Sequence, residues 1–204
     1  GCSFVIVNSG VKAFKGQNEI TKTLYNTRVA ECRIGSALVA RRLHIHLSRT
    51  VSSPGQMYNM AKAGGQVSSV RELHDRMLSV LGPNEEISFD EAVSELGLSV
   101  VEVRNRFFLG MEFADPRFKI GKRLRHVFSE AARVDRFRDL LSRDRADLPL
   151  VPDAQQERAI IDELGHILSA SHTSLRDQYE CSCPEVDHLV AYCMDNGSVG
   201  SRIT

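Results

Sequence analysis

Apolar residues recur along much of the chain at intervals of three and four, the spacing that gives an amphipathic helix one buried face. In residues 25–43, Ala30, Ile34, Ala37 and Leu38 fall on one side of such a helix. A longer stripe follows, made of Leu124, Val127, Phe128, Ala131, Val134, Phe137 and Leu141. Another consists of Leu164, Ile167, Leu168, Ser171 and Leu175. This pattern predicts a predominantly helical chain.

Three helix starts carry the pattern of a capping box, in which a serine hydroxyl and a glutamate three residues later satisfy the free backbone amides of the first turn. The pairs are Ser88 with Glu91, Ser99 with Glu102, and Ser182 with Glu185. Gly97 divides the first two helices, and Pro184 suits the first turn of the third. We therefore expect two short helices before residue 108 and another after residue 183.

Other stretches depart from helical spacing. Residues 4–7, Phe-Val-Ile-Val, form a continuous apolar run closed by Asn8-Ser9-Gly10, which predicts a short strand buried on both faces. Residues 47–67 are rich in small residues and contain Pro54-Gly55 and Gly64-Gly65, so we expect a loop with at most short helical pieces. The closing residues 200–204 are compatible with the start of a strand.

Charge and composition narrow the functional classes. The 204 residues include 26 Lys plus Arg and 26 Asp plus Glu, so no net field draws the whole chain to nucleic acid or an anionic membrane. The five cysteines are scattered and odd in number, which favours reduced thiols in the cytosol. No apolar run reaches the roughly 20 residues that cross a bilayer. The apolar run follows Gly1 almost directly, so we expect a piece of a longer soluble protein.

Candidate chemistry in the sequence is sparse. The spacing of Cys181 and Cys183 near His188 is tighter than that of common zinc pairs, which favours ordinary cysteines. The segment of residues 87–107 has the length of a helix-turn-helix, but its acidic side chains favour a packing helix pair.

Residues 171–179 contain every side chain type of a hydrolase triad, yet neighbours on one helix do not converge, so we expect structural roles. No glycine loop for phosphates is present.

Four blocks in this order nevertheless resemble one family. They are FVIVNSGV at 4–11, YNTRVAECR at 25–33, RHVFSEAARV at 125–134 and SHTSLRDQYECSCPEVDHLV at 171–190, with GSRIT at the end. In this order they resemble the second half of galactokinases and N-acetylgalactosamine kinases, in the superfamily that includes homoserine and mevalonate kinases. The resemblance covers roughly residues 1–45 and 120–204.

The resemblance implies an α+β fold of that kinase superfamily, of which this chain is a predominantly helical piece with one N-terminal strand. We expect residues 1–45 to end the amino-terminal domain, residues 46–120 to form a helical insertion, and residues 121–204 to belong to the carboxyl-terminal domain. The phosphate loop and the catalytic aspartate would precede residue 1, and a glycine-rich motif would follow GSRIT.

The implied activity is phosphorylation of the C1 hydroxyl of galactose or N-acetylgalactosamine by ATP with Mg²⁺, in the cytoplasm. The resemblance places Tyr25 in the sugar pocket and Lys15 near the ATP phosphates, with no catalytic residue in this chain. We therefore expect the chain alone to be inactive, with a second chain as one source of the missing half. A non-catalytic sensor of sugar and ATP that binds a transcriptional regulator, or a degenerate paralogue, stays open as an alternative.

Overall fold

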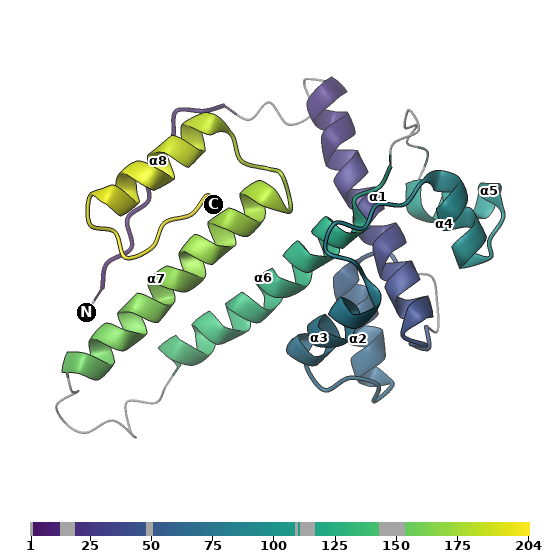
Figure 1. Cartoon of the computed structure of the whole chain (residues 1–204), viewed down its shortest axis with the longest axis horizontal. Helices are drawn as coiled ribbons and strands as arrows, with labels where there is room; N and C mark the ends of the chain where they lie inside the picture. The colour runs from purple at the N-terminus through teal and green to yellow at the C-terminus, as the bar shows by residue number, and fades with distance from the viewer. Residues whose placement is uncertain (1, 13–18, 48–50, 109, 111–116, 143–153) are drawn as a thin grey trace. The chain divides into compact units, whose positions relative to one another are not determined.

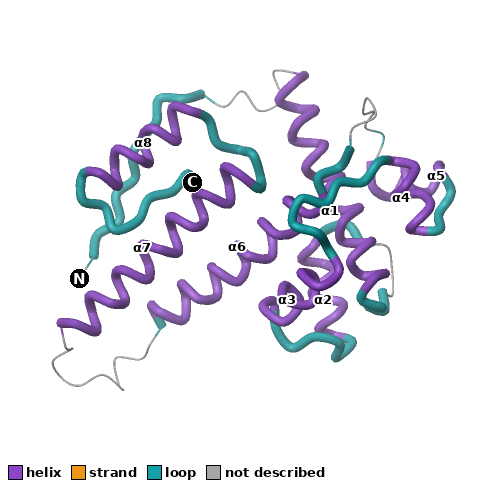
Figure 2. Tube along the Cα trace, in the orientation of Figure 1, coloured by secondary structure: helices purple, strands orange, loops and turns teal. Residues whose placement is uncertain are grey.

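The computed structural model describes residues 2–12, 19–47, 51–108, 110, 117–142 and 154–204. Helices make up most of this part of the chain (Figure 2), as the spacing of apolar residues predicts. The α-helices, labelled in Figure 1, are α1 (Glu19–Arg42), α2 (Pro54–Ala63), α3 (Val70–Val80), α4 (Phe89–Leu96), α5 (Val100–Val103), α6 (Ile120–Leu141), α7 (Ala154–Asp177) and α8 (Pro184–Asp195). A π-helix, η1 (Arg104–Phe108), follows α5 directly.

The predicted strand at residues 4–7 does not form. The four side chains are between 51% and 92% exposed, and none of residues 2–12 belongs to a helix or a strand. A strand is stable only when a neighbouring strand takes up its backbone hydrogen bonds, and the described residues contain no other strand to do so. The turn after the run is present, with Gly10 at φ +73° and its amide bound to the Asn8 side chain.

The chain divides into two compact units, each described here by itself. Unit 1 comprises Gly1–Ala13 and Glu130–Thr204, and unit 2 comprises Phe14–Ser129. The helix α6 therefore begins in unit 2 and ends in unit 1. These two units are defined by contacts within this chain alone and do not test the predicted domains of a longer protein. The three predicted ranges, residues 1–45, 46–120 and 121–204, therefore stay predictions.

Unit 2 is organised around α1. Ala30, Ile34 and Leu38, three of the four positions predicted to share a face, are fully buried. The helix contacts α2, α3, α4 and η1 (Figure 1), and Phe107, Phe118 and Met77 complete the same core. The periodic pattern therefore identified the central helix of this unit correctly.

The structure corrects the expected loop at residues 47–67, because α2 runs from Pro54 to Ala63. The Ser53 hydroxyl accepts a hydrogen bond from the Gln56 amide, and Pro54 occupies the first turn. Proline is well tolerated there because its missing N–H has no helical partner in any case. The Pro54-Gly55 pair therefore begins a helix, whereas the sequence predicts that it interrupts one.

Two of the three predicted capping boxes are confirmed. In α4 and α5 the serine hydroxyls of Ser88 and Ser99 each accept a hydrogen bond from the glutamate amide three residues on, and each glutamate binds back. The third prediction is wrong, because α8 begins after Cys183 without a side-chain cap. The Ser182 hydroxyl instead donates to Asp187, at 2.6 Å between oxygens.

α6, which runs from unit 2 into unit 1, and α7 of unit 1 confirm the helices predicted from the later apolar stripes. The stripe of α6 is not buried throughout, since Val134 and Leu141 are exposed while Leu124 and Phe128 are buried. α8 lies along α7 (Figure 1), joined to it by a polar contact of 3.2 Å between His172 Nε2 and Asp187 Oδ1. None of the described helices is long and apolar enough to cross a membrane.

The start of α6 is held in place by a close backbone contact. The Gly121 amide donates to the Glu85 carbonyl oxygen at 2.9 Å, and Phe118 and Ile87 exchange two backbone hydrogen bonds beside it. A β-carbon at Gly121 would overlap the Gly82 carbonyl oxygen and lie 2.6 Å from the Glu85 nitrogen. Only glycine fits here without a shift of backbone, because these neighbours are main-chain atoms.

We predict that Gly121→Ala lowers the free energy of unfolding by about 1–3 kcal/mol, because the added methyl group pushes the 82–85 loop off α6. Urea unfolding followed by circular dichroism measures the change. The matched control is Gly55→Ala, another helical glycine of unit 2, whose β-carbon would meet nothing within 4 Å. It should stabilise the chain by about 0.5–1 kcal/mol. Equal effects of the two substitutions would contradict the close contact.

Candidate functional site

The two residues that the resemblance assigns to ligand binding have different standings in the structure. Tyr25 lies in the first half of α1, and its side chain is 61% exposed. Lys15 lies outside the described residues. Within this chain the Tyr25 ring and hydroxyl are therefore open to solvent, and its predicted place in a sugar pocket stays a prediction.

Among the described charged residues of unit 2, the least exposed is Glu31, on α1. Glu31 and Arg123 are 1% and 3% exposed, and the Arg123 Nε atom lies 2.6 Å from Glu31 Oε2. The other carboxylate oxygen accepts the Lys119 amide at 2.8 Å, one residue before α6 begins. This carboxylate therefore neutralises a buried arginine and satisfies a free amide at the helix start. Its burial gives it a structural role.

The thiol of Cys32, next to Glu31, has no nucleophilic character. Burial raises its pKa to about 12, the negative charge of Glu31 acts in the same direction, and Arg123 opposes both. The thiolate is the reactive form of cysteine, so this group stays protonated and inert at neutral pH.

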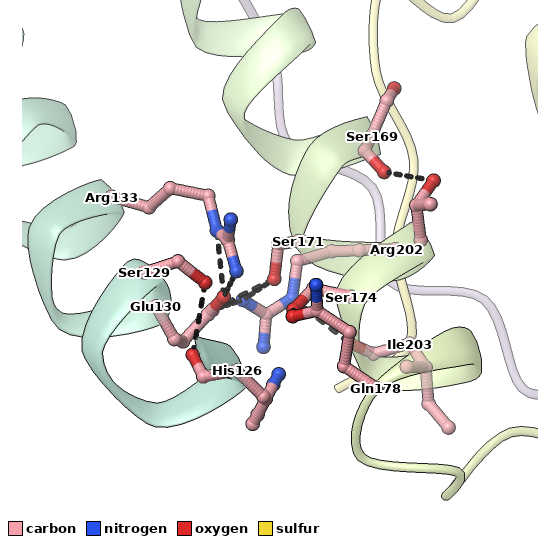
Figure 3. Close-up of polar contacts among 11 residues, drawn as sticks. His126, Ser129, Glu130, Arg133, Ser169, Ser171, Ser174, Gln178, Arg202 and Ile203 are labelled. Atoms are coloured by element: carbon pink, nitrogen blue, oxygen red, sulfur yellow. Dashed lines mark hydrogen bonds and ion pairs between the residues drawn. The ribbon is translucent and has the colours of Figure 1, made fainter. Parts of the chain in front are cut away.

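A second group of polar side chains is centred on Glu130 in unit 1 (Figure 3). Its Oε1 atom accepts the Ser171 hydroxyl at 2.7 Å and the Arg202 Nη1 atom at 2.9 Å. Its Oε2 atom accepts Arg133 Nε at 2.9 Å, and Arg202 also donates to the Ser171 oxygen. We call these four residues the Glu130 cluster. It joins α6, α7 and the segment after α8.

The charge state of Glu130 follows from this environment. Partial burial raises its pKa, but the hydrogen bonds from Ser171 and Arg133 and the positive charges of Arg133 and Arg202 outweigh that effect and lower the pKa overall. The carboxylate is therefore ionised at neutral pH and strengthens each bond that it accepts.

Sequence reasoning missed this cluster. From the residues alone, Ser171 is one of several polar neighbours on a helix, and residues 200–204 are compatible with the start of a strand, which the described residues 200–204 do not form. The signal that was available is positional: Glu130, Ser171 and Arg202 each fall in a block that carries the family resemblance.

A third group contains serine, histidine and aspartate but is not a catalytic triad. The His172 Nε2 atom lies 3.2 Å from Asp187 Oδ1, and the Ser182 hydroxyl donates to the same oxygen. In a triad the serine would face the free nitrogen of the histidine. Here the buried Nδ1 atom of His172 has no hydrogen-bond partner. The group therefore joins α7 to α8 and supports the structural interpretation of residues 171–179.

The remaining alternatives receive little support. The described residues contain no group of three His, Cys, Asp or Glu side chains that could hold a metal ion. In the segment considered as a helix-turn-helix, Arg106 pairs with Glu102 at 2.9 Å and Arg104 stacks on the Phe89 ring at 5.2 Å. These guanidinium groups make contacts within the unit, as expected of a packing helix pair.

We predict that unit 1 loses stability as the pH falls below about 6.5, because His172 is 4% exposed. Burial lowers its pKa below the ordinary value of 6.5, Asp187 and Asp177 oppose this effect, and Arg176 adds to it. The unfolded chain therefore binds a proton in this range that the folded chain does not, and unfolding becomes easier.

Urea unfolding at pH 7.5 and 5.5 and an NMR titration of the imidazole measure this effect. His172→Gln should lose less stability on acidification than the unsubstituted chain, whereas His188→Gln, at an exposed position of α8, should behave like the unsubstituted chain. A titration midpoint for His172 at or above 6.5 would refute the prediction.

Comparisons with known proteins give one consistent result. A galactokinase of Dictyostelium discoideum is 30% identical over 209 residues, covering 100% of this chain and 40% of that protein. A galactokinase of Saccharomyces cerevisiae is 25% identical over 223 residues, covering 99% of this chain and 40% of that protein. A galactokinase of Bacillus subtilis is 51% identical over 45 residues, 22% of this chain and 12% of that protein. No protein-family model matches the chain.

The similarity to the first two relatives extends along the whole chain, including the segments between the four blocks. The chain spans about 40% of the length of these relatives. Over its whole length, the chain is therefore similar in sequence to part of the curated galactokinases.

Proposed function

We propose that this chain is part of a sugar kinase that transfers the γ-phosphoryl group of ATP to the C1 hydroxyl of galactose or N-acetylgalactosamine. One observation carries the proposal, namely the similarity of the whole chain to galactokinases of an amoeba and a yeast. Those proteins are more than twice as long, and the proposal assigns most of the reaction site to sequence beyond these 204 residues. A cytoplasmic location is part of the proposal, and the five cysteines, all of which the structure describes, form no disulfide bond.

The fold of the complete protein is proposed to be the α+β fold of the small-molecule kinase superfamily. The exposed apolar run at residues 4–7 supports this idea, because it has the composition of a buried strand and lacks strand neighbours in the described chain. The rest of the protein, in the same or a second chain, would supply the sheet. Covering this run would also remove an aggregation hazard.

Tyr25 is proposed to contact the sugar. Its exposure leaves the ring free to pack on the apolar face of a pyranose while the hydroxyl donates or accepts a hydrogen bond. Lys15 is proposed to lie near the ATP phosphates, where its ammonium group would offset negative charge.

ATP and Mg²⁺ are proposed to bind mainly outside this chain. Mg²⁺ is usually held by carboxylates and phosphates, and the described residues offer no group of three candidate ligands. The carboxylates of Glu31 and Glu130 are already paired with arginines. The chain also lacks a glycine loop to bind phosphates, and the base that accepts the C1 hydroxyl proton would come from other sequence.

We predict that the 204-residue chain alone releases no ADP from MgATP and galactose, whereas a galactokinase-length protein that contains it forms galactose 1-phosphate. A coupled ADP assay and ³¹P NMR of the sugar product measure this difference. Turnover by the chain alone would refute the division of the site, and no turnover by the longer protein would refute the proposed activity.

In the same longer protein, Tyr25→Phe should lower kcat/KM for galactose about 10-fold, because one hydrogen bond to the sugar is lost while the ring remains. Tyr192→Phe is the matched control, since Tyr192 on α8 is similarly exposed at 64%. It should change kcat/KM less than about twofold. Equal effects of the two substitutions would remove Tyr25 from the sugar site.

A further inference from the structure

The Glu130 cluster lies where three segments of family resemblance meet. Glu130 comes from the block at 125–134, Ser171 opens the block at 171–190, and Arg202 lies in the closing residues 200–204. A single guanidinium nitrogen of Arg202 donates to both of the others, at 2.9 Å each (Figure 3). The Ser171 hydroxyl is buried and donates to the same carboxylate oxygen, so the three groups form a closed ring of hydrogen bonds.

A second contact holds the same segment two residues earlier. A β-carbon at Gly165 of α7 would overlap the Val199 carbonyl oxygen, and one at Gly200 would overlap the Gly165 carbonyl oxygen. The two backbones therefore touch directly, and both positions require glycine on steric grounds. This contact and the Glu130 cluster attach the segment to α7 at two points.

Nothing in the secondary structure fixes this segment otherwise. Residues 199–204 are all described, and they form neither helix nor strand. Their path is therefore set by side-chain and close-packing contacts rather than by a backbone hydrogen-bond ladder. Arg202 is the charged residue of this segment, whereas the contact between Gly165 and Gly200 is purely steric.

We propose that Arg202 is a positioning residue, which fixes the path of residues 199–203 on α7 and keeps the groups of this segment in place for the kinase reaction. This inference rests on the proposed function, in which this segment supports the kinase site. In this role Arg202 acts through the segment that it holds, by its hydrogen bonds to Glu130 and Ser171. Loss of its charge should misplace neighbouring groups without removing any of them, and small misplacements of reacting groups cost rate steeply.

The first test measures order in the 204-residue chain itself. The ¹⁵N order parameters of the amides at 200–203 should fall from about 0.85 in the unsubstituted chain to below about 0.6 in Arg202→Met. Arg202→Lys should retain most of the order, because an ammonium group still reaches Glu130. Arg138→Met, an exposed arginine of α6, is the matched control and should change nothing.

Unchanged order in Arg202→Met would overturn the proposal. Should that variant fold poorly, Ser171→Ala removes one bond of the ring, and its order parameters should fall by a smaller amount; no fall would count equally against the proposal.

The second test uses the galactokinase-length protein. Arg202→Met should lower kcat about 10- to 100-fold while the KM for galactose changes less than about twofold, and Arg202→Lys should recover at least part of the rate. A disordered segment with unchanged kcat would overturn the positioning role and leave the proposed function intact. Absence of activity in the unsubstituted protein would overturn the proposed function, and the kinetic role of Arg202 with it.

Discussion

A carboxylate buried away from water must be paired, and in unit 2 this constraint is met by Glu31. Its two oxygens bind the Arg123 guanidinium and the Lys119 amide. One side chain of α1 therefore neutralises the charge of Arg123 and holds the backbone at the start of α6. The cost of leaving either charge alone in the interior is several kcal/mol. The core of Ile34, Leu38 and Phe118 therefore closes only when these two helices meet in one register.

The same constraint explains where the family resemblance lies in the structure. Glu31 falls in the block at 25–33, and Glu130, Ser171 and Arg202 fall in three later blocks. The side chains of Glu130, Ser171 and Arg202 bind one another, so these three blocks of the resemblance contain residues that join segments of unit 1. Tyr25 differs from them, because its exposed side chain contributes little to packing and remains available to a ligand.

The sequence predicted what depends on local interactions. Apolar spacing identified α1, α6 and α7, and the serine and glutamate pairs located the starts of α4 and α5, because these signals lie within a few residues of each other. The loop expected around Pro54 is wrong because proline both breaks helices and begins them. The strand expected at 4–7 does not form because the described part of the chain offers it no neighbouring strand. The pairing of Glu31 with Arg123 spans 92 residues and has no local signal.

The central claim is that one paired, buried carboxylate joins α1 to the start of α6, and a double-mutant cycle on Glu31 and Arg123 tests it most directly. Glu31→Gln keeps an oxygen for the Lys119 amide, and Arg123→Met keeps the bulk of the side chain. Free energies of unfolding of the two single variants and the double variant give the coupling between the residues. The account predicts a coupling of about 2 kcal/mol. Additive effects, with a coupling near zero, would contradict it.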